Sequence, residues 1–117
     1  MKNNYFYIII IFFLISCNNK QSSNNHDGYQ IYVKNACNTC HSLDGSRMIG
    51  PTLDGIFGSK VVLSNGKTVI ADENYLIRSI IDPSIELVKG YPNLMGSYKA
   101  VLSADEINAL IEFIKEQ

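Results

Sequence analysis

Apolar residues recur with helical spacing at three places in this 117-residue chain, and they form one unbroken run near its start. The first helical pattern has apolar residues at i, i+3, i+4 and i+7, namely Tyr29, Tyr32, Val33 and Ala36. This spacing predicts an amphipathic helix that starts near Gly28 and runs into Cys37.

The second and third patterns carry clear start and stop signals. Asp72 is a suitable N-cap for the second, and Pro83 disfavours helical geometry at the residue before it. Between them lie two i,i+4 apolar pairs, Leu76/Ile80 and Ile77/Ile81. The third begins with the sequence of a capping box, Ser103 to Glu106. It continues as one apolar stripe made of Ile107, Leu110, Ile111 and Ile114.

The stretch between the first two patterns is punctuated by glycine and predicts loops with one small hairpin. Asn65 and Gly66 are typical of its turn. We therefore expect an all-α fold with three to four short helices. A domain of about ninety residues with so little regular structure needs a staple, and a large apolar cofactor would supply one.

The unbroken apolar run extends from Tyr5 to Ile15 and is too short for a good membrane span. Eleven residues rise about 16 Å as a helix, roughly half of a bilayer core. Such a run fits the apolar region of a signal peptide. The following "LISC" resembles the lipobox of bacterial lipoproteins, where the chain is cut before the cysteine and that cysteine carries a lipid. We predict a signal peptide over 1–16 and lipidation of Cys17. An ordinary signal peptide would leave an odd exposed thiol.

Residues 17–27 are polar and predict a flexible tether in front of a domain at 28–117. His26 lies in this tether and is expected to be solvated. A lipid on Cys17 would anchor the domain to a bacterial membrane in the cell envelope, facing the periplasm or the cell exterior. The formal net charge is −1 and no basic run occurs, so nucleic acid is not an expected partner.

The stretch Cys37-Asn-Thr-Cys40-His41 is compatible with three chemistries. A structural zinc site needs four ligands, whereas these residues offer three and no second cysteine pair occurs. A redox dithiol usually starts a helix after a strand, whereas here a helical pattern precedes the pair. Covalent haem attachment uses all three residues. The two thiols can form thioether bonds, and the histidine can bind the iron.

A haem iron bound by His41 would need a second axial ligand from elsewhere in the chain. Met95 lies in the loop sequence "GYPNLMGSY" between the second and third predicted helices, where glycine and proline disfavour helix. Met48 follows His41 too closely for the chain to pass round the haem edge, and we interpret it as loop packing. Met95 is therefore the predicted second ligand.

From Gly28 to the C-terminus the chain resembles the class I c-type cytochromes. Within that family it is most similar to the cytochrome c domain fused to some bacterial cytochrome oxidase subunits II. The resemblance rests on "CNTCH", "GPTLDGIFG", "ADENYLIRSIIDPS" and "GYPNLMGSYKAVLSADEINALIEFIKEQ", which occur in family order. Two features differ. Gly96 stands where the family usually has proline after the methionine, and the copper domain and membrane helices of the oxidase subunit are absent. The resemblance thus implies a free-standing, lipid-tethered relative.

The resemblance also implies a small fold around one covalently bound haem c, with Gly28 of the first helix crossing the last helix at Phe113. His41 and Met95 are implied as axial ligands. The Pro51 carbonyl is implied to accept a hydrogen bond from His41 Nδ1. Aromatic residues near the haem and its propionates are implied at Tyr75 and Tyr91.

With both axial positions filled, the implied function is that of a monomeric one-electron carrier and not of an enzyme. The implied partners are membrane respiratory complexes: a quinol-oxidising complex, and a terminal oxidase or reductase. The expected docking surface is an apolar rim, with Lys89 or Lys99 for steering; the rim consists of Met48, Ile49, Leu94 and Met95. The alternative is a haem enzyme or a gas or peroxide sensor, which would use the sixth iron position after the Met95 loop opens.

Overall fold

The structure is a computed structural model that describes the backbone of residues 23–117 and the side chains of residues 28–117. The predictions for residues 1–22, lipidation of Cys17 among them, lie outside the described residues, as does the side chain of His26. The described part contains three helices, a one-turn 3-10 helix and two strands: α1 (Ser23–Lys34), η1 (Cys37–Thr39), β1 (Lys60–Val62), β2 (Thr68–Ile70), α2 (Glu73–Ile81) and α3 (Ala104–Lys115). A helical fold with little strand is thus confirmed. No helix in residues 23–117 combines the length and the apolarity needed to cross a bilayer.

Helix α1 differs from its prediction at both ends. It begins at Ser23, inside the predicted tether, and it ends at Lys34 instead of continuing into Cys37. Two features explain the early end. The side chain of Asn35 donates a hydrogen bond to the Ile31 carbonyl, and Ala36 has φ 57°, in the left-handed region. Because a left-handed residue cannot continue a right-handed helix, the chain turns there and starts η1.

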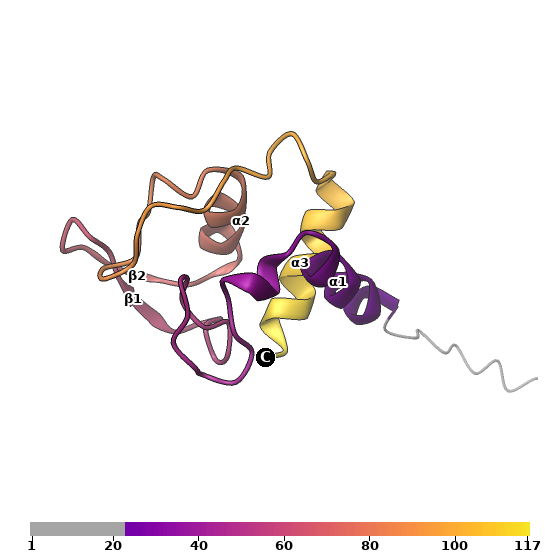
Figure 1. Cartoon of the computed structure of the whole chain (residues 1–117), viewed down its shortest axis with the longest axis horizontal. Coiled ribbons are helices and arrows are strands. Elements are labelled where there is room, and N and C mark those ends of the chain that lie inside the picture. The colour runs from indigo at the N-terminus through magenta and orange to yellow at the C-terminus, as the bar shows by residue number, and fades with distance from the viewer. Residues whose placement is uncertain (1–22) are drawn as a thin grey trace, which may run out of the picture.

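Helices α1 and α3 cross at Gly28, as expected (Figure 1). A Cβ atom on Gly28 would overlap the Ala109 carbonyl oxygen and the Phe113 Cβ, so only glycine allows the helices to come this close. The Phe113 ring packs at 5.8 Å from the Tyr29 ring and 5.5 Å from the Tyr32 ring, measured between centroids. This aromatic contact joins the two ends of the domain.

The predicted caps of the other two helices are present. The Asp72 side chain accepts a hydrogen bond from the Tyr75 backbone N–H at 2.8 Å, and α2 ends at Ile81, just before Asp82. At α3, the Glu106 backbone N–H donates to the Ser103 hydroxyl at 3.2 Å, and the Ser103 backbone N–H donates to the Glu106 carboxylate at 2.9 Å. These bonds form the complete capping box and fix where α3 begins.

The predicted hairpin is also present. Strands β1 and β2 pair antiparallel, with Val61 opposite Val69. The turn contains Gly66 at φ +84°. Beyond β1, Leu63 forms a bridge with Val88, and the Lys89 backbone N–H donates to the Val62 carbonyl at 2.9 Å. The hairpin therefore holds the start of the long connection between α2 and α3.

One apolar core joins these elements. Its buried side chains come from all three helices, from the hairpin and from two residues in the connections beside them: Ile31, Tyr32, Val61, Leu63, Ala71, Tyr75, Leu76, Ile80, Leu102, Leu110, Ile111, Phe113 and Ile114. Figure 1 shows α1 and α3 at one end of the view and the hairpin at the other, with α2 between them. The core fills only part of the molecule, and a cavity remains beside it.

Candidate functional site

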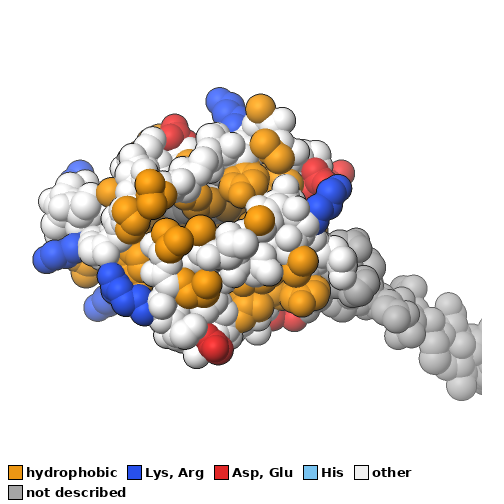
Figure 2. All heavy atoms as spheres, in the orientation of Figure 1, with side chains coloured by type: hydrophobic (Ala, Val, Ile, Leu, Met, Phe, Trp, Pro, Cys, Tyr) orange, Lys and Arg blue, Asp and Glu red, His pale blue; other side chains and the backbone are white. Residues whose placement is uncertain are grey.

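A cavity of about 260 Å³ opens between the segment that follows α1 and the long connection between α2 and α3. Figure 2 shows apolar side chains gathered around a hollow on the face in view. All of the predicted haem-site residues line this cavity: Cys37, Cys40, His41, Pro51, Tyr75, Tyr91 and Met95. The folded chain thus brings together residues that lie far apart in the sequence.

Cys37 and Cys40 are placed by η1, which follows the left-handed turn at Ala36. Both thiols are free and half-buried, and both residues line the cavity. Burial raises the pKa of the Cys37 thiol, the neighbouring Cys40 adds to the rise, and a backbone hydrogen bond opposes it. The His41 backbone N–H donates to the Cys37 carbonyl at 2.9 Å. The motif is therefore one compact turn with two thiols and an imidazole at the cavity wall.

The His41 ring is held by the segment that follows it. Its Nδ1 lies 2.7 Å from the Pro51 carbonyl oxygen. A carbonyl oxygen can only accept, so Nδ1–H is the donor and the neutral ring keeps its lone pair on Nε2. The hydrogen bond that the family resemblance implied is thus present. This hydrogen bond leaves Nε2, the ring nitrogen that could bind a metal, without a proton.

Gly50 provides the space for this ring. A Cβ atom on Gly50 would lie 2.5 Å from His41 Cε1 and 2.8 Å from Nδ1. The Gly50 backbone N–H also donates to the Cys40 carbonyl at 2.8 Å, which fixes the glycine against the CxxCH turn. Sequence analysis did not identify Gly50, although its position directly before Pro51 could have indicated a close backbone approach.

Tyr32 is a further supporting residue that the sequence analysis placed only on the apolar face of a helix. Its side chain is buried, and its hydroxyl donates to the His41 backbone carbonyl at 2.5 Å. Burial raises the pKa of Tyr32, so its hydroxyl stays protonated and able to donate. The bond ties the backbone of His41 to α1.

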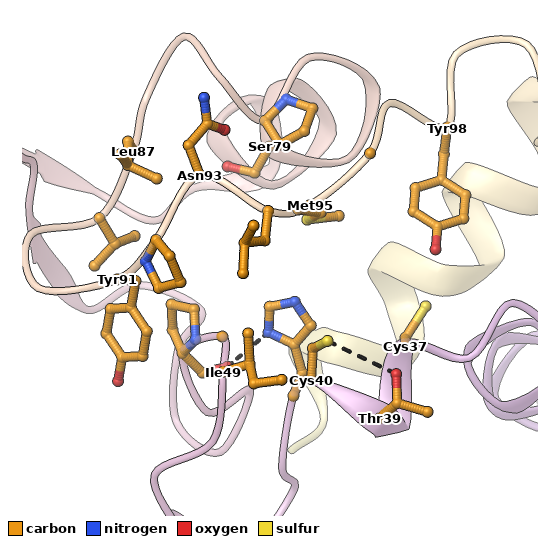
Figure 3. Close-up of a pocket in the computed structure, with 18 of the residues that line it drawn as sticks. Cys37, Thr39, Cys40, Ile49, Ser79, Leu87, Tyr91, Asn93, Met95 and Tyr98 are labelled. Atoms are coloured by element: carbon orange, nitrogen blue, oxygen red, sulfur yellow. Dashed lines mark hydrogen bonds between the residues drawn. The ribbon is translucent and has the colours of Figure 1, made fainter.

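Met95 faces the CxxCH turn from the other side of the cavity. In Figure 3, Met95 and Ser79 lie on one side of the central space, and Ile49 and Cys40 lie on the opposite side. Met95 is 36% exposed and sits in the connection between α2 and α3. Met48, which was predicted to pack within its loop, is instead exposed and does not line the cavity.

Ser79 contributes a polar group that lacks a partner. Within residues 28–117, its Oγ is the one buried side-chain oxygen or nitrogen without a hydrogen bond. Buried hydroxyls are normally paired, so this orphan indicates that a bound group or water completes the site. Burial raises the pKa of nearby Tyr75.

These residues fit a covalently attached haem. Two thiols are available for thioether bonds, an imidazole nitrogen and a thioether sulfur are available as iron ligands, and the walls are largely apolar. A zinc site fits less well, because no group of three His, Cys, Asp or Glu side chains among residues 28–117 is arranged to hold a metal ion. Fold and site together define a c-type cytochrome.

Comparisons with known proteins agree. Residues 26–117 match the family Cytochrome c. The chain is 30% identical over 94 residues to cytochrome c2 iso-1 of Magnetospirillum fulvum, which covers 69% of this chain and 90% of that protein. The structure resembles cytochrome cH from Methylobacterium extorquens with a TM-score of 0.60 at 20% identity, over 80% of this chain and 98% of the other, a likeness of fold.

The chain therefore belongs to the cytochrome c family. It has the small cytochrome c fold and binds haem c covalently, with Cys37 and Cys40 as the two cysteines of the attachment motif. The homologues cytochrome c2 and cytochrome cH are electron-transfer proteins and not enzymes.

Proposed function

We propose that this protein is a one-electron carrier in which His41 and Met95 occupy the two axial positions of the iron. The observation that carries the proposal is that both side chains line one cavity, whose wall also contains the two attachment cysteines. The haem supplies an iron that cycles between the ferrous and ferric states. With both axial positions filled, no coordination site is left for a substrate.

The residues of this chain then have separate tasks. Cys37 and Cys40 hold the haem by thioether bonds. The Pro51 carbonyl fixes the His41 tautomer at 2.7 Å and strengthens the imidazole as a donor. Met95 would favour the ferrous state, because a thioether is a soft ligand, and the apolar walls would disfavour the extra charge of ferric iron.

An absorption spectrum of the purified ferric protein tests the ligation. We expect the weak red charge-transfer band of a methionine–iron bond at neutral pH and its loss in Met95→Ala. Met48→Ala is the matched control, since Met48 is exposed and does not line the cavity. A band that survives in Met95→Ala would exclude Met95 as the ligand.

The same experiment separates the carrier from its alternative, a haem enzyme or a gas or peroxide sensor. Two observations favour keeping that alternative. Gly96 follows Met95, and a Cβ atom on Gly96 would have no other atom within 4 Å. Met95 itself is 36% exposed. A high-spin spectrum and rapid carbon monoxide binding in the unaltered protein would support the sensor or enzyme and contradict the carrier.

We further propose that a lipid on Cys17 anchors the protein to a bacterial membrane, facing the periplasm or the cell exterior. Support comes from "LISC" after an apolar run and from the polar residues 17–27. The anchor would raise the effective concentration of the carrier beside membrane partners. We expect Cys17→Ser to move the protein from the membrane fraction to the soluble fraction. A variant that stays in the membrane would contradict lipidation.

The partners that this arrangement favours are respiratory complexes: a quinol-oxidising donor and a terminal oxidase or reductase as acceptor. The resemblance of residues 28–117 to the cytochrome domain of oxidase subunit II supports this choice. Reduction and reoxidation of the purified protein by isolated membrane complexes tests it. A carrier that exchanges electrons with none of them would contradict it.

A further inference from the structure

Arg47 bridges the two sides of the haem cavity without lining it. Its Nη2 donates a hydrogen bond to the Gly90 carbonyl at 2.8 Å. Its guanidinium carbon lies 4.5 Å from the centroid of the Tyr91 ring, in the geometry of a cation–π contact. These contacts join the loop after His41 to the connection that carries Met95, two segments that are 43 residues apart.

The loop that carries Arg47 is exposed over residues 44–49 but is held by hydrogen bonds within itself. Within it, the Ser42 hydroxyl donates to the Ser46 carbonyl at 2.6 Å, and the Ser46 backbone N–H donates to the Asp44 carboxylate at 3.0 Å. Hydrogen bonds from the Ser46 side chain and backbone hold the pKa of Asp44 below its usual value. Ser42 is itself buried.

The Met95 segment, in contrast, is held mainly at its two ends. Residues 92–96 are all exposed, and within them the described backbone makes one hydrogen bond, from Leu94 N–H to the Pro92 carbonyl at 3.0 Å. The far end is fixed at Tyr98, whose N–H donates to the Ile80 carbonyl at 3.1 Å and whose hydroxyl donates to the Asn35 carbonyl at 3.0 Å. The near end is fixed at Gly90 and Tyr91.

Gly90 is shaped for the contact with Arg47. It has φ +84°, which favours glycine, and a Cβ atom there would lie 3.8 Å from Arg47 Nη2. The Gly90 carbonyl accepts the hydrogen bond from the Arg47 guanidinium, and the Tyr91 ring lies against the same guanidinium.

We propose that Arg47 is a positioning residue that latches the near end of the Met95 segment and so limits how often Met95 leaves the iron. This inference rests on the proposed ligation by Met95. Loss of a charged hydrogen bond and a surface cation–π contact should raise the open population about tenfold. A ligand that binds only the open form gains affinity in proportion to that population.

The test uses the purified ferric holoprotein and two readouts. Imidazole, which competes for the sixth position, should bind Arg47→Ala about tenfold more tightly than the unaltered protein. Chymotrypsin should cut after Leu94, which is 72% exposed, about tenfold faster in Arg47→Ala, while cutting after Phe57 stays unchanged because that loop lies outside the latch. Lys67→Ala, which removes one surface charge from the hairpin turn, should match the unaltered protein in both readouts.

Equal imidazole affinity and equal cleavage after Leu94 in Arg47→Ala and the unaltered protein would overturn the latch. If Arg47→Ala does not take up haem, Arg47→Gln carries the same comparison, because its shorter neutral side chain cannot stack on Tyr91. Ligation by Met95 is read from the spectrum of the unaltered protein alone, whereas the latch is read from the comparison of cleavage between Arg47→Ala and the unaltered protein. A missing charge-transfer band in the unaltered protein would therefore refute ligation by Met95, whereas unchanged cleavage would refute the latch.

Discussion

Gly50 and His41 show how one residue without a side chain determines the geometry of the haem site. The imidazole lies so close to the Gly50 backbone that a methyl group would contact Cε1 at 2.5 Å. The ring is therefore fixed on one side by backbone and at Nδ1 by the Pro51 carbonyl. The Gly50 backbone and the Pro51 carbonyl together set the orientation of the ring.

We expect Gly50→Ala to displace the His41 ring and weaken its hydrogen bond to Pro51. The imidazole then donates less to the iron, so ferric haem is less stabilised and the reduction potential rises, on the order of tens of millivolts. Potentiometry of the purified protein measures the shift. Pro51→Ala is the informative comparison, because it keeps the backbone carbonyl and should change the potential less. Equal shifts in both variants would contradict the role given to Gly50.

Among the elements, the pair α1 and α3 depends on one close approach. Gly28 contacts the Ala109 carbonyl and Phe113, and the rings of Tyr29 and Tyr32 surround the Phe113 ring. Helix α1 ends just before the CxxCH turn, and Tyr32 binds the His41 carbonyl. The crossing point of these helices therefore sets the position of the haem attachment site.

Gly28→Ala should destabilise the protein although alanine favours helix more than glycine does. The new methyl group meets backbone that cannot move aside, so the helices must separate, at a cost of about 1 to 3 kcal/mol. Thermal unfolding of the haem-loaded protein measures the loss. Gln30→Ala, at an exposed position of the same helix, should leave the midpoint nearly unchanged. An unchanged midpoint in Gly28→Ala would show that the crossing tolerates a wider separation.

For the molecule as a whole, the exposed apolar rim around the cavity is the surface on which a partner would meet the haem. Met48, Ile49, Leu94 and Met95 are exposed there, and Figure 2 shows apolar side chains beside the hollow. Lys89 and Lys99 are also exposed. Electron-transfer encounters are small and short-lived, so a few side chains can decide their rate.

We expect Leu94→Asp to slow electron transfer with isolated respiratory complexes about tenfold, because a carboxylate at the centre of an apolar contact must lose its water. The rate with a small inorganic oxidant should stay unchanged, since no protein docks in that reaction. Val101→Asp is the matched control: Val101 is 60% exposed in the same connection but does not line the cavity. Equal slowing in both variants would place docking elsewhere.

The sequence by itself determined the elements and the chemistry of the site. Helical periodicity, the Asp72 and Ser103 caps and the Asn65-Gly66 turn are short-range signals, and the structure contains each of them. The CxxCH motif carries its chemistry within five residues. Helix α1 was misplaced at both ends, and its early C-terminal end escaped prediction because a left-handed Ala36 has no signal in its own residue type.

Tertiary structure alone decided how these parts meet. Four features depend on the folded path of the chain: the packing of Gly50 against His41, the hydrogen bond from the Tyr32 hydroxyl to the His41 carbonyl, the unpaired Ser79 hydroxyl, and the Arg47 bridge to Gly90. Periodicity reports which face of an element is apolar, but not which distant residue packs on it. Those contacts arise only when segments far apart in the chain are folded against one another.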